Sequence, residues 1–156
     1  MRIYIGSDHA GYELKGEIVQ HLSSAGHDVT DIGPAEYDAA DDYPVFCFHT
    51  GAATVADDGS LGIVLGGSGN GEQIAANKVA GVRAILAWST EIAQLGREHN
   101  NANVVSLGAR MHSREEALAI VDAFINEPFS GGDRHQRRIQ QMLDFEDKPE
   151  LPLLPE

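Results

Sequence analysis

The sequence predicts a three-layer α/β domain: a doubly wound parallel sheet of five strands with helices on both faces. Short apolar runs alternate along the chain with segments of helical spacing. Continuous apolar runs are typical of parallel strands that are buried on both faces. Each run also ends at a glycine-rich or polar turn, where such sheets bind their ligands.

Five apolar runs are the predicted strands: residues 3–5, 29–32, 61–65, 84–88 and 104–107. Helices are predicted from apolar spacing and from capping residues. The first helix has Leu14, Ile18 and Leu22 on one face, and the second begins at Pro44 and carries Phe48, Ala52 and Val55. The third begins at about Glu72, and the fourth is capped by Thr90 and runs towards His99. The fifth begins at the Ser113–Glu116 capping box and ends near Asn126, and the last covers about 134–145.

Length and charge limit the class of protein. The 156 residues fit one domain, expected over 1–147, followed by a proline-rich tail over 148–156. Eleven basic and 24 acidic residues give a net charge of −13, which disfavours nucleic-acid and anionic-membrane partners. The start lacks the apolar run of a signal peptide, and no membrane span is expected. A single cysteine, Cys47, excludes an internal disulfide, so we expect a cytoplasmic protein.

The loop from Gly66 to Gly71 is the strongest local signal for a ligand. Four glycines in six residues, between a buried strand and a helix, let backbone N–H groups converge on an anion. The loop lacks the Gly-Lys-Ser/Thr ending of a P-loop, and it does not follow the first strand as a dinucleotide motif would. A flexible turn without a ligand is the less favoured alternative, because each glycine costs entropy on folding.

Glu72 follows this loop directly. A carboxylate at a helix N-terminus often has no further role, because the helix dipole alone favours its ionised form. Beside an anion-binding loop, however, it is placed to abstract a proton next to a carbonyl group. Cys47 has two phenylalanine neighbours and is expected to be buried and unreactive.

A basic cluster stands out in this acidic chain. Arg134 and Arg138, four residues apart, share one face of the last predicted helix. We favour a phosphate ligand for these two, because guanidinium groups match phosphate geometry. For Arg137 we favour a salt bridge or a solvated position. His9, His99 and His135 lie next to candidate site segments.

Four ordered motifs together resemble type B ribose-5-phosphate isomerase, in the superfamily that includes galactose-6-phosphate isomerase subunits. They are GSDHAG at 6–11, GSGNG at 67–71 with Glu72, EHNNAN at 98–103 and GAR at 108–110. The resemblance extends to about Phe145. It implies a flavodoxin-like five-stranded fold, a homodimer or dimer of dimers with shared active sites, and no metal or organic cofactor. The reaction implied is interconversion of D-ribose 5-phosphate and D-ribulose 5-phosphate in the non-oxidative pentose phosphate pathway.

One position departs from many members of this family, which carry a cysteine base directly after the third strand. Here that position is Gly66, and the sequence is similar to the subgroup whose base is a glutamate, here Glu72. The implied catalytic residues are Glu72, His99, Asp8 and Ser68, with His99 opening the sugar ring and Asp8 assisting. The implied substrate-binding residues are Asp8, His9, Gly67, Ser68, Gly69, Asn70, Gly71, Asn100, Arg110, Arg134 and Arg138.

Two other functions stay open at this point. One is isomerisation of a six-carbon sugar phosphate such as allose or galactose 6-phosphate, which differs only in pocket size. The other is a non-catalytic nucleotide- or flavin-binding module, since fold alone does not determine function.

Overall fold

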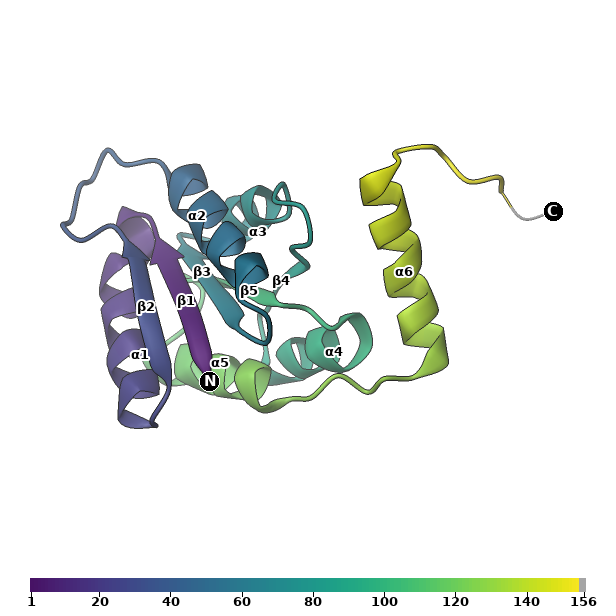
Figure 1. Cartoon of the computed structure of the whole chain (residues 1–156). Helices are drawn as coiled ribbons and strands as arrows, with labels where there is room; N and C mark the ends of the chain where they lie inside the picture. Colours follow the sequence, from purple (N-terminus) through teal and green to yellow (C-terminus); the bar gives the residue numbers. More distant parts are fainter. Residues whose placement is uncertain (155–156) are drawn as a thin grey trace.

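A computed structural model describes residues 1–154 and shows a single five-stranded parallel sheet between two layers of helices (Figure 1). The strand order is β2-β1-β3-β5-β4, and every pairing is parallel. The strands are β1 (Arg2–Ser7), β2 (Asp28–Gly33), β3 (Leu61–Gly66), β4 (Ala84–Leu86) and β5 (Val104–Gly108). The predicted fold class is therefore confirmed.

The helices divide between the two faces of the sheet. The larger core cluster contains side chains from α1 (Tyr12–Ser24), α4 (Thr90–Asn100) and α5 (Arg114–Asn126). The smaller cluster, on the opposite face, contains side chains from α2 (Tyr43–Ala56) and α3 (Asn70–Ala76). Successive residues of the central strand alternate between the two clusters, as the two-residue period of a strand requires.

The strand order explains which face each helix covers. A flavodoxin order would place β4 next to β3, but here β5 lies between them. The connection from β4 to β5 therefore runs back towards the centre of the sheet, in the same direction as the connection from β1 to β2. Because crossovers are right-handed, α4 lies on the same face as α1.

The buried side of α2 differs from the one expected. Phe48 and Val55 are 42% and 39% exposed, and Ala52 is exposed as well. The residues that face the sheet are Cys47, Thr50, Gly51 and Thr54. The threonine hydroxyls donate to carbonyl groups one turn earlier, at 2.8 Å, so no polar atom of theirs is left unpaired. Small and self-satisfied side chains let α2 approach the sheet closely, and the larger apolar residues face outward.

Two boundaries also differ from the prediction. Ser89, and not Thr90, caps α4: its hydroxyl accepts the Ile92 N–H at 3.3 Å. The fourth strand ends at Leu86, because the chain turns at Trp88 to reach that cap. The capping box of Ser113 and Glu116 at the start of α5 is confirmed.

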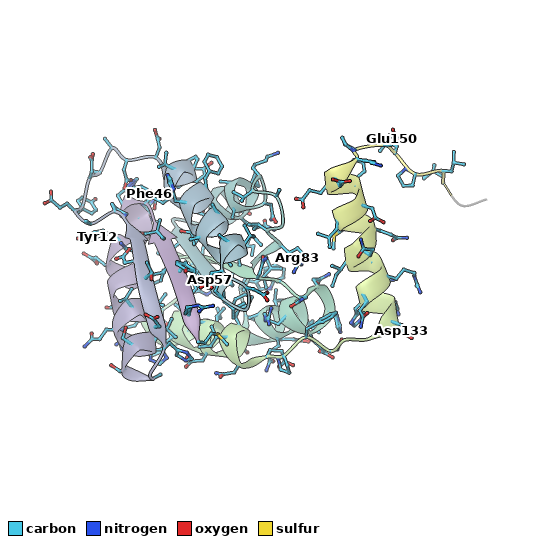
Figure 2. The ribbon with its side chains drawn as sticks, in the orientation of Figure 1. Tyr12, Phe46, Asp57, Arg83, Asp133 and Glu150 are labelled. Carbon is cyan, nitrogen blue, oxygen red and sulfur yellow. The ribbon has the colours of Figure 1, made fainter. Side chains whose placement is uncertain are left out.

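The last helix, α6 (Asp133–Asp147), stands away from the layered body and lies beside α4 (Figure 1). Ile139 is its one buried residue. Figure 2 labels Asp133 at its start and Glu150 beyond its end, and most of its side chains point into open space. The expected tail over 148–156 carries no helix or strand through residue 154, and its last two residues lie outside the described part. None of the helices described is long and apolar enough to cross a membrane.

The close packing of α2 on the sheet makes a prediction about stability. A Cβ atom at Gly62 would lie 2.5 Å from Thr54 Oγ1 and 3.0 Å from Val104 Cγ2. Gly62→Ala should therefore lower the free energy of unfolding by about 1–3 kcal/mol through overpacking, measured by urea denaturation. Gly16→Ala, in α1 with no atom within 4 Å of its added Cβ, is the matched control and should be neutral or slightly stabilising. Equal stability of the two variants would contradict this packing argument.

Candidate active site

The loops after β1, β3 and β5 meet at the carboxyl edge of the sheet. β1 and β3 are neighbours whose connections leave in opposite directions, which makes this edge the switch point where doubly wound sheets bind ligands. The Asp8 N–H donates to the Leu65 carbonyl at 3.3 Å, and the Ala109 and Arg110 N–H groups donate to Gly66 and Gly67 at 2.8 and 3.1 Å. These backbone bonds join the three loops into one rigid platform.

Glu72 lies at the centre of this platform, and it is only 4% exposed. Its carboxyl group fills the space in front of Gly66: a Cβ atom at position 66 would coincide with the Glu72 carboxylate. The cysteine that the resemblance implies at this position in many members of that family and a buried Glu72 would therefore exclude each other. Glu72 can occupy this position only because residue 66 has no side chain.

The environment of Glu72 suits a general base. Burial raises the pKa of its carboxyl group, and the negative charge of Asp8 raises it further. Backbone N–H groups of Glu72 itself and of Gly69 oppose the rise. A carboxylate with a raised pKa is a stronger proton acceptor than one in water, and it stays ionised only above that pKa.

The glycine-rich loop packs too closely for side chains. Gly69 has a φ of 82°, and a Cβ there would meet Leu107 and Gly108 at 2.9 and 3.1 Å. Its carbonyl oxygen accepts the buried Ser106 hydroxyl at 2.6 Å, which fixes the loop onto β5. Ser68 and Asn70 remain exposed, with the Ser68 hydroxyl accepting the Asn70 side-chain amide at 3.2 Å.

Asp8 and His9 open the short 3₁₀ helix η1 (His9–Gly11) after β1. Asp8 is 7% exposed, and its Oδ1 accepts the backbone N–H groups of Ala10 and Gly11 at 2.9 and 3.3 Å. The His9 ring bonds through Nδ1 to Asp41 Oδ1 at 2.7 Å. The charge of Asp8 is thus held next to Glu72, and His9 is held at the edge of the platform.

Asp8, His9 and Asp41 also match a divalent-cation ligand set in residue type, with one ligand atom of each within 4.8 Å of the others. Hydrogen bonds already account for the arrangement, however. Asp8 Oδ1 receives two backbone N–H groups, while the His9 ring and Asp41 are bonded to each other. The geometry therefore does not require a metal ion.

Arg110 and Cys47 both lie near the glycine-rich loop and Glu72. The guanidinium group of Arg110 lies over Gly67, since a Cβ there would be 3.5 Å from its Nη1. Cys47 is fully buried, and burial, with the charges of Glu72 and Asp8, raises the pKa of its thiol to about 12. The expected burial of Cys47 is confirmed, and a raised thiol pKa is in keeping with an unreactive side chain.

The remaining predicted residues form a second group at a different place. His99 and Asn100 end α4, and Arg134 and Arg138 lie on the exposed surface of α6. The His99 ring lies 4.4 Å from that of His135, which ties the end of α4 to the start of α6. Arg134, Arg137 and Arg138 form no ion pair with any of residues 1–154, so these three guanidinium groups are solvated in the single chain.

The two groups lie at opposite edges of the sheet. The backbone carbonyl of Asn100 accepts a bond from Arg83, which directly precedes β4, so the end of α4 lies at the amino edge of the strands. Asp8 and Glu72 lie at the carboxyl edge. The four steps from Val104 to Gly108 along β5 separate the two edges by about 13 Å, at roughly 3.3 Å per step. One chain therefore does not bring His99 and Glu72 together.

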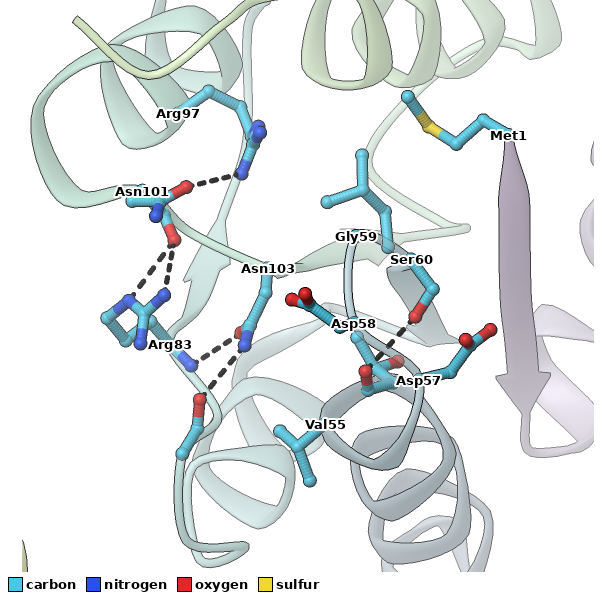
Figure 3. Close-up of a pocket in the computed structure, with 13 residues that line it drawn as sticks. Met1, Val55, Asp57, Asp58, Gly59, Ser60, Arg83, Arg97, Asn101 and Asn103 are labelled. Carbon is cyan, nitrogen blue, oxygen red and sulfur yellow. Dashed lines mark hydrogen bonds between the residues drawn. The ribbon is translucent and has the colours of Figure 1, made fainter. Parts of the chain in front are cut away.

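A separate hollow of about 360 Å³ opens at the amino edge (Figure 3). Its arginines serve the backbone: Arg83 donates to the Asn101 carbonyl at 2.9 Å, and Arg97 donates to the Ala102 carbonyl at 2.6 Å. Asn101 has a φ of 44°, so these bonds hold the left-handed turn that ends α4. The two arginines that line the hollow are thus already bonded to the end of α4.

Sequence reasoning missed two residues of the site, Asp41 and Tyr43. The Tyr43 ring packs directly over Gly71, where a Cβ would lie 2.6 Å from the ring, and Asp41 binds His9. Both come from the acidic loop and the start of α2, far from the glycine-rich motifs. A tyrosine just before the helix-opening Pro44 was the available signal, but nothing in the spacing connects it to Gly71.

A buried carboxylate of raised pKa, beside a glycine-rich loop at the switch point of a doubly wound sheet, is typical of enzymes that move protons on small substrates. The sequence matches the family described as Ribose/Galactose Isomerase over residues 3–142. It is 59% identical over 155 residues to ribose-5-phosphate isomerase B of Mycobacterium tuberculosis (strain CDC 1551 / Oshkosh), covering 99% of this chain and 96% of that protein. Identity to the Escherichia coli (strain K12) protein of the same name is 39%, over 94% of this chain and 97% of that one.

The structure of ribose-5-phosphate isomerase B from Mycoplasma genitalium, solved with bound ribulose-5-phosphate, superposes with a TM-score of 0.90. That structure is 44% identical in sequence and covers 94% of this chain and 97% of its own. The chain belongs to the ribose/galactose isomerase family. The match confirms the resemblance seen in the motifs, and it favours an isomerase over a non-catalytic nucleotide- or flavin-binding module.

The dependence of Glu72 on Gly66 is testable. Gly66→Ala should displace the Glu72 carboxyl and lower kcat about 10²-fold, since a shift of about 1 Å in a reacting group costs that much. In a Glu72→Gln background the same change should add little further loss, because the group that it displaces is already inactive. The measurement is a double-mutant cycle of steady-state kinetics with ribose 5-phosphate. Independent, additive losses would show that Gly66 serves another purpose.

Proposed function

We propose that this chain interconverts D-ribose 5-phosphate and D-ribulose 5-phosphate through a cis-enediolate, in the non-oxidative pentose phosphate pathway. The observation that carries the proposal is the buried Glu72 carboxylate against Gly66 in a member of this family. The relative from Mycoplasma genitalium, whose structure holds ribulose-5-phosphate, supports the substrate. We place the reaction in the cytoplasm, in keeping with the single free thiol of Cys47.

In the proposed mechanism Glu72 takes the proton from C2 of the open-chain aldose and returns it to C1 of the enediolate. The C2 hydroxyl gives up its proton and becomes the ketone, and the C1 carbonyl oxygen gains that proton and becomes a hydroxyl. Fixed N–H dipoles of the glycine-rich loop stabilise the oxygen on which negative charge develops. His99 opens the furanose ring with the help of Asp8, and the exposed Ser68 hydroxyl completes the catalytic set.

Basic side chains are proposed to hold the substrate phosphate. A dianion must approach a protein of net charge −13, and clustered guanidinium groups supply a local field that overrides the mean one. Arg134 and Arg138 have no ion-pair partner within residues 1–154, which supports a ligand role over a structural one. His9 and Arg110, at the edge of the platform, complete the proposed phosphate site.

The site is proposed to form between two copies of the chain. His99 and the α6 arginines lie at the opposite edge of the sheet from Glu72, so a complete site needs the second group from a partner. Apolar surface next to His99 supports this: a hollow of about 430 Å³ along β4 and α4 includes Trp88, which is 63% exposed. A homodimer, alone or paired into a dimer of dimers, would cover this surface and complete two sites.

The test of the reaction is incubation of the purified protein with ribose 5-phosphate, followed by a ketose assay. Allose 6-phosphate and galactose 6-phosphate, assayed in parallel, test the six-carbon alternative. A kcat/KM for ribose 5-phosphate at least tenfold above both is the expected result. A preference for either six-carbon sugar would overturn the assignment of substrate.

Glu72→Gln keeps the shape of the side chain and removes the base. The kcat should fall by roughly 10²–10⁴, with KM little changed, and exchange of the C2 hydrogen with solvent deuterium should disappear. In the unmodified protein, burial raises the pKa of Glu72, so kcat/KM should decline as pH falls through a value above the usual 4.5 of a glutamate. A variant with near-normal kcat would make Asp8 the first alternative base.

Sharing of the site predicts complementation between two inactive proteins. His99→Ala and Glu72→Gln should each be inactive alone. After they are dissociated and reassembled together, mixed dimers should contain one intact site and recover part of the activity. Mass spectrometry of the mixture confirms that mixed dimers form. Mixed dimers without activity would mean that each chain holds a whole site.

A further inference from the structure

The His9 side chain is held by a carboxylate from a distant part of the chain. Asp41 Oδ1 accepts two bonds from this one residue, the backbone N–H at 2.9 Å and ring Nδ1 at 2.7 Å. A single oxygen that receives both groups fixes the backbone and the ring plane of His9 together. The Asp41 side chain is only 9% exposed, so water competes weakly for these bonds.

The loop that carries Asp41 is itself ordered. Asp38 turns the chain: its side chain accepts the Ala40 N–H at 2.9 Å, and its carbonyl accepts the Asp41 N–H at 3.1 Å. The Tyr37 ring meets the His9 ring edge-on, with centroids 6.4 Å apart and planes at 89°. His9 is therefore contacted both by the Asp41 carboxylate and by the ring of Tyr37.

Among the described residues, the Asp41 side chain forms hydrogen bonds with His9 alone. Its Oδ1 bonds only to His9, and its Oδ2 is buried with no hydrogen-bond partner among residues 1–154. Burial of an under-bonded carboxylate costs free energy. The neighbouring Asp42, by contrast, is exposed and makes no side-chain cap bond at the start of α2.

We propose that Asp41 is a positioning residue for phosphate recognition. By accepting a hydrogen bond from Nδ1–H of His9, it turns ring Nε2 towards the substrate phosphate. A carboxylate oxygen can only accept, so Nδ1 is the protonated nitrogen in this pair. Nε2, across the ring, is then the polar atom that points away from Asp41. The inference rests on the proposed function, in which His9 contacts the phosphate.

The sign of the change in KM distinguishes a carboxylate that positions His9 from one that only lies near the phosphate. A carboxylate that merely lies near a dianion repels it, so its removal would tighten phosphate binding. A carboxylate that positions His9 has the opposite effect, because without it the ring samples other rotamers before it binds. The change in KM on removal of Asp41 therefore has opposite signs in the two cases.

The experiment compares Asp41→Ala, Asp41→Asn, His9→Gln and the control Asp42→Asn, in the full chain. We expect Asp41→Ala to raise the KM for ribose 5-phosphate and the inhibition constant of inorganic phosphate about tenfold, with kcat within about twofold, as loss of a charged hydrogen bond predicts. Asp41→Asn keeps an oxygen that accepts both bonds and should restore most of the affinity. Asp42→Asn should match the unmodified protein.

An unchanged or lowered KM in Asp41→Ala would overturn the proposal, as would effects of Asp41→Ala and His9→Gln that add in the double variant. If Asp41→Ala does not fold, nitrogen-15 NMR of the unmodified protein provides the second test: His9 protonated at Nε2 alone contradicts the proposal. Failure of the proposed function looks different. The unmodified protein would then not isomerise ribose 5-phosphate at all. His9→Gln with both constants unchanged would refute the contact of His9 with the phosphate, whereas an impaired His9→Gln beside a normal Asp41→Ala would refute only the role of Asp41.

Discussion

The close approach of three loops at the carboxyl end of β3 is the constraint on which the site depends. β3 lies at the centre of the sheet, with β1 on one side and β5 on the other. At each contact a side chain is missing: a Cβ at Gly11 would lie 2.7 Å from the Leu65 Cβ, and one at Gly108 would lie 2.7 Å from the Ser68 carbonyl oxygen. This closeness lets the backbones of the three loops form hydrogen bonds with one another. It also brings Asp8 close enough to Glu72 for its negative charge to raise the pKa of the Glu72 carboxyl group.

The same constraint links the position of Glu72 to the strand that precedes it. The Glu72 carboxyl occupies the volume that any side chain at position 66 would need, so the two positions form one unit. A carboxylate in the first turn of α3 is held more rigidly than one on a loop, because the helix fixes its backbone. Burial of the carboxylate costs free energy, which the backbone N–H groups of Gly69 and Glu72 partly offset.

The sequence predicted the parts of this arrangement that are local. Glycine-rich turns after apolar runs indicated the loops, and the capping box indicated the start of α5, because both depend on neighbouring residues. Contacts between distant segments were not predictable in this way: Asp41 binds a residue 32 positions earlier. The buried side of α2 was mistaken for a different reason. Its threonines bond to their own helix and pack against sheet glycines, so apolar spacing pointed to the wrong face.

Topology explains why the second group of residues stands apart. In a right-handed β–α–β crossover the helix runs antiparallel to its strands, so the end of α4 necessarily lies at the amino edge of the sheet. His99 thus reaches the carboxyl edge of a sheet only if that sheet belongs to another copy. In a two-fold dimer each copy would give its α4–α6 group and receive its partner's, so one interface closes two sites. In the proposed dimer α6 would have a function that it lacks within one chain, because among the described residues its arginines are unpaired and it buries a single side chain.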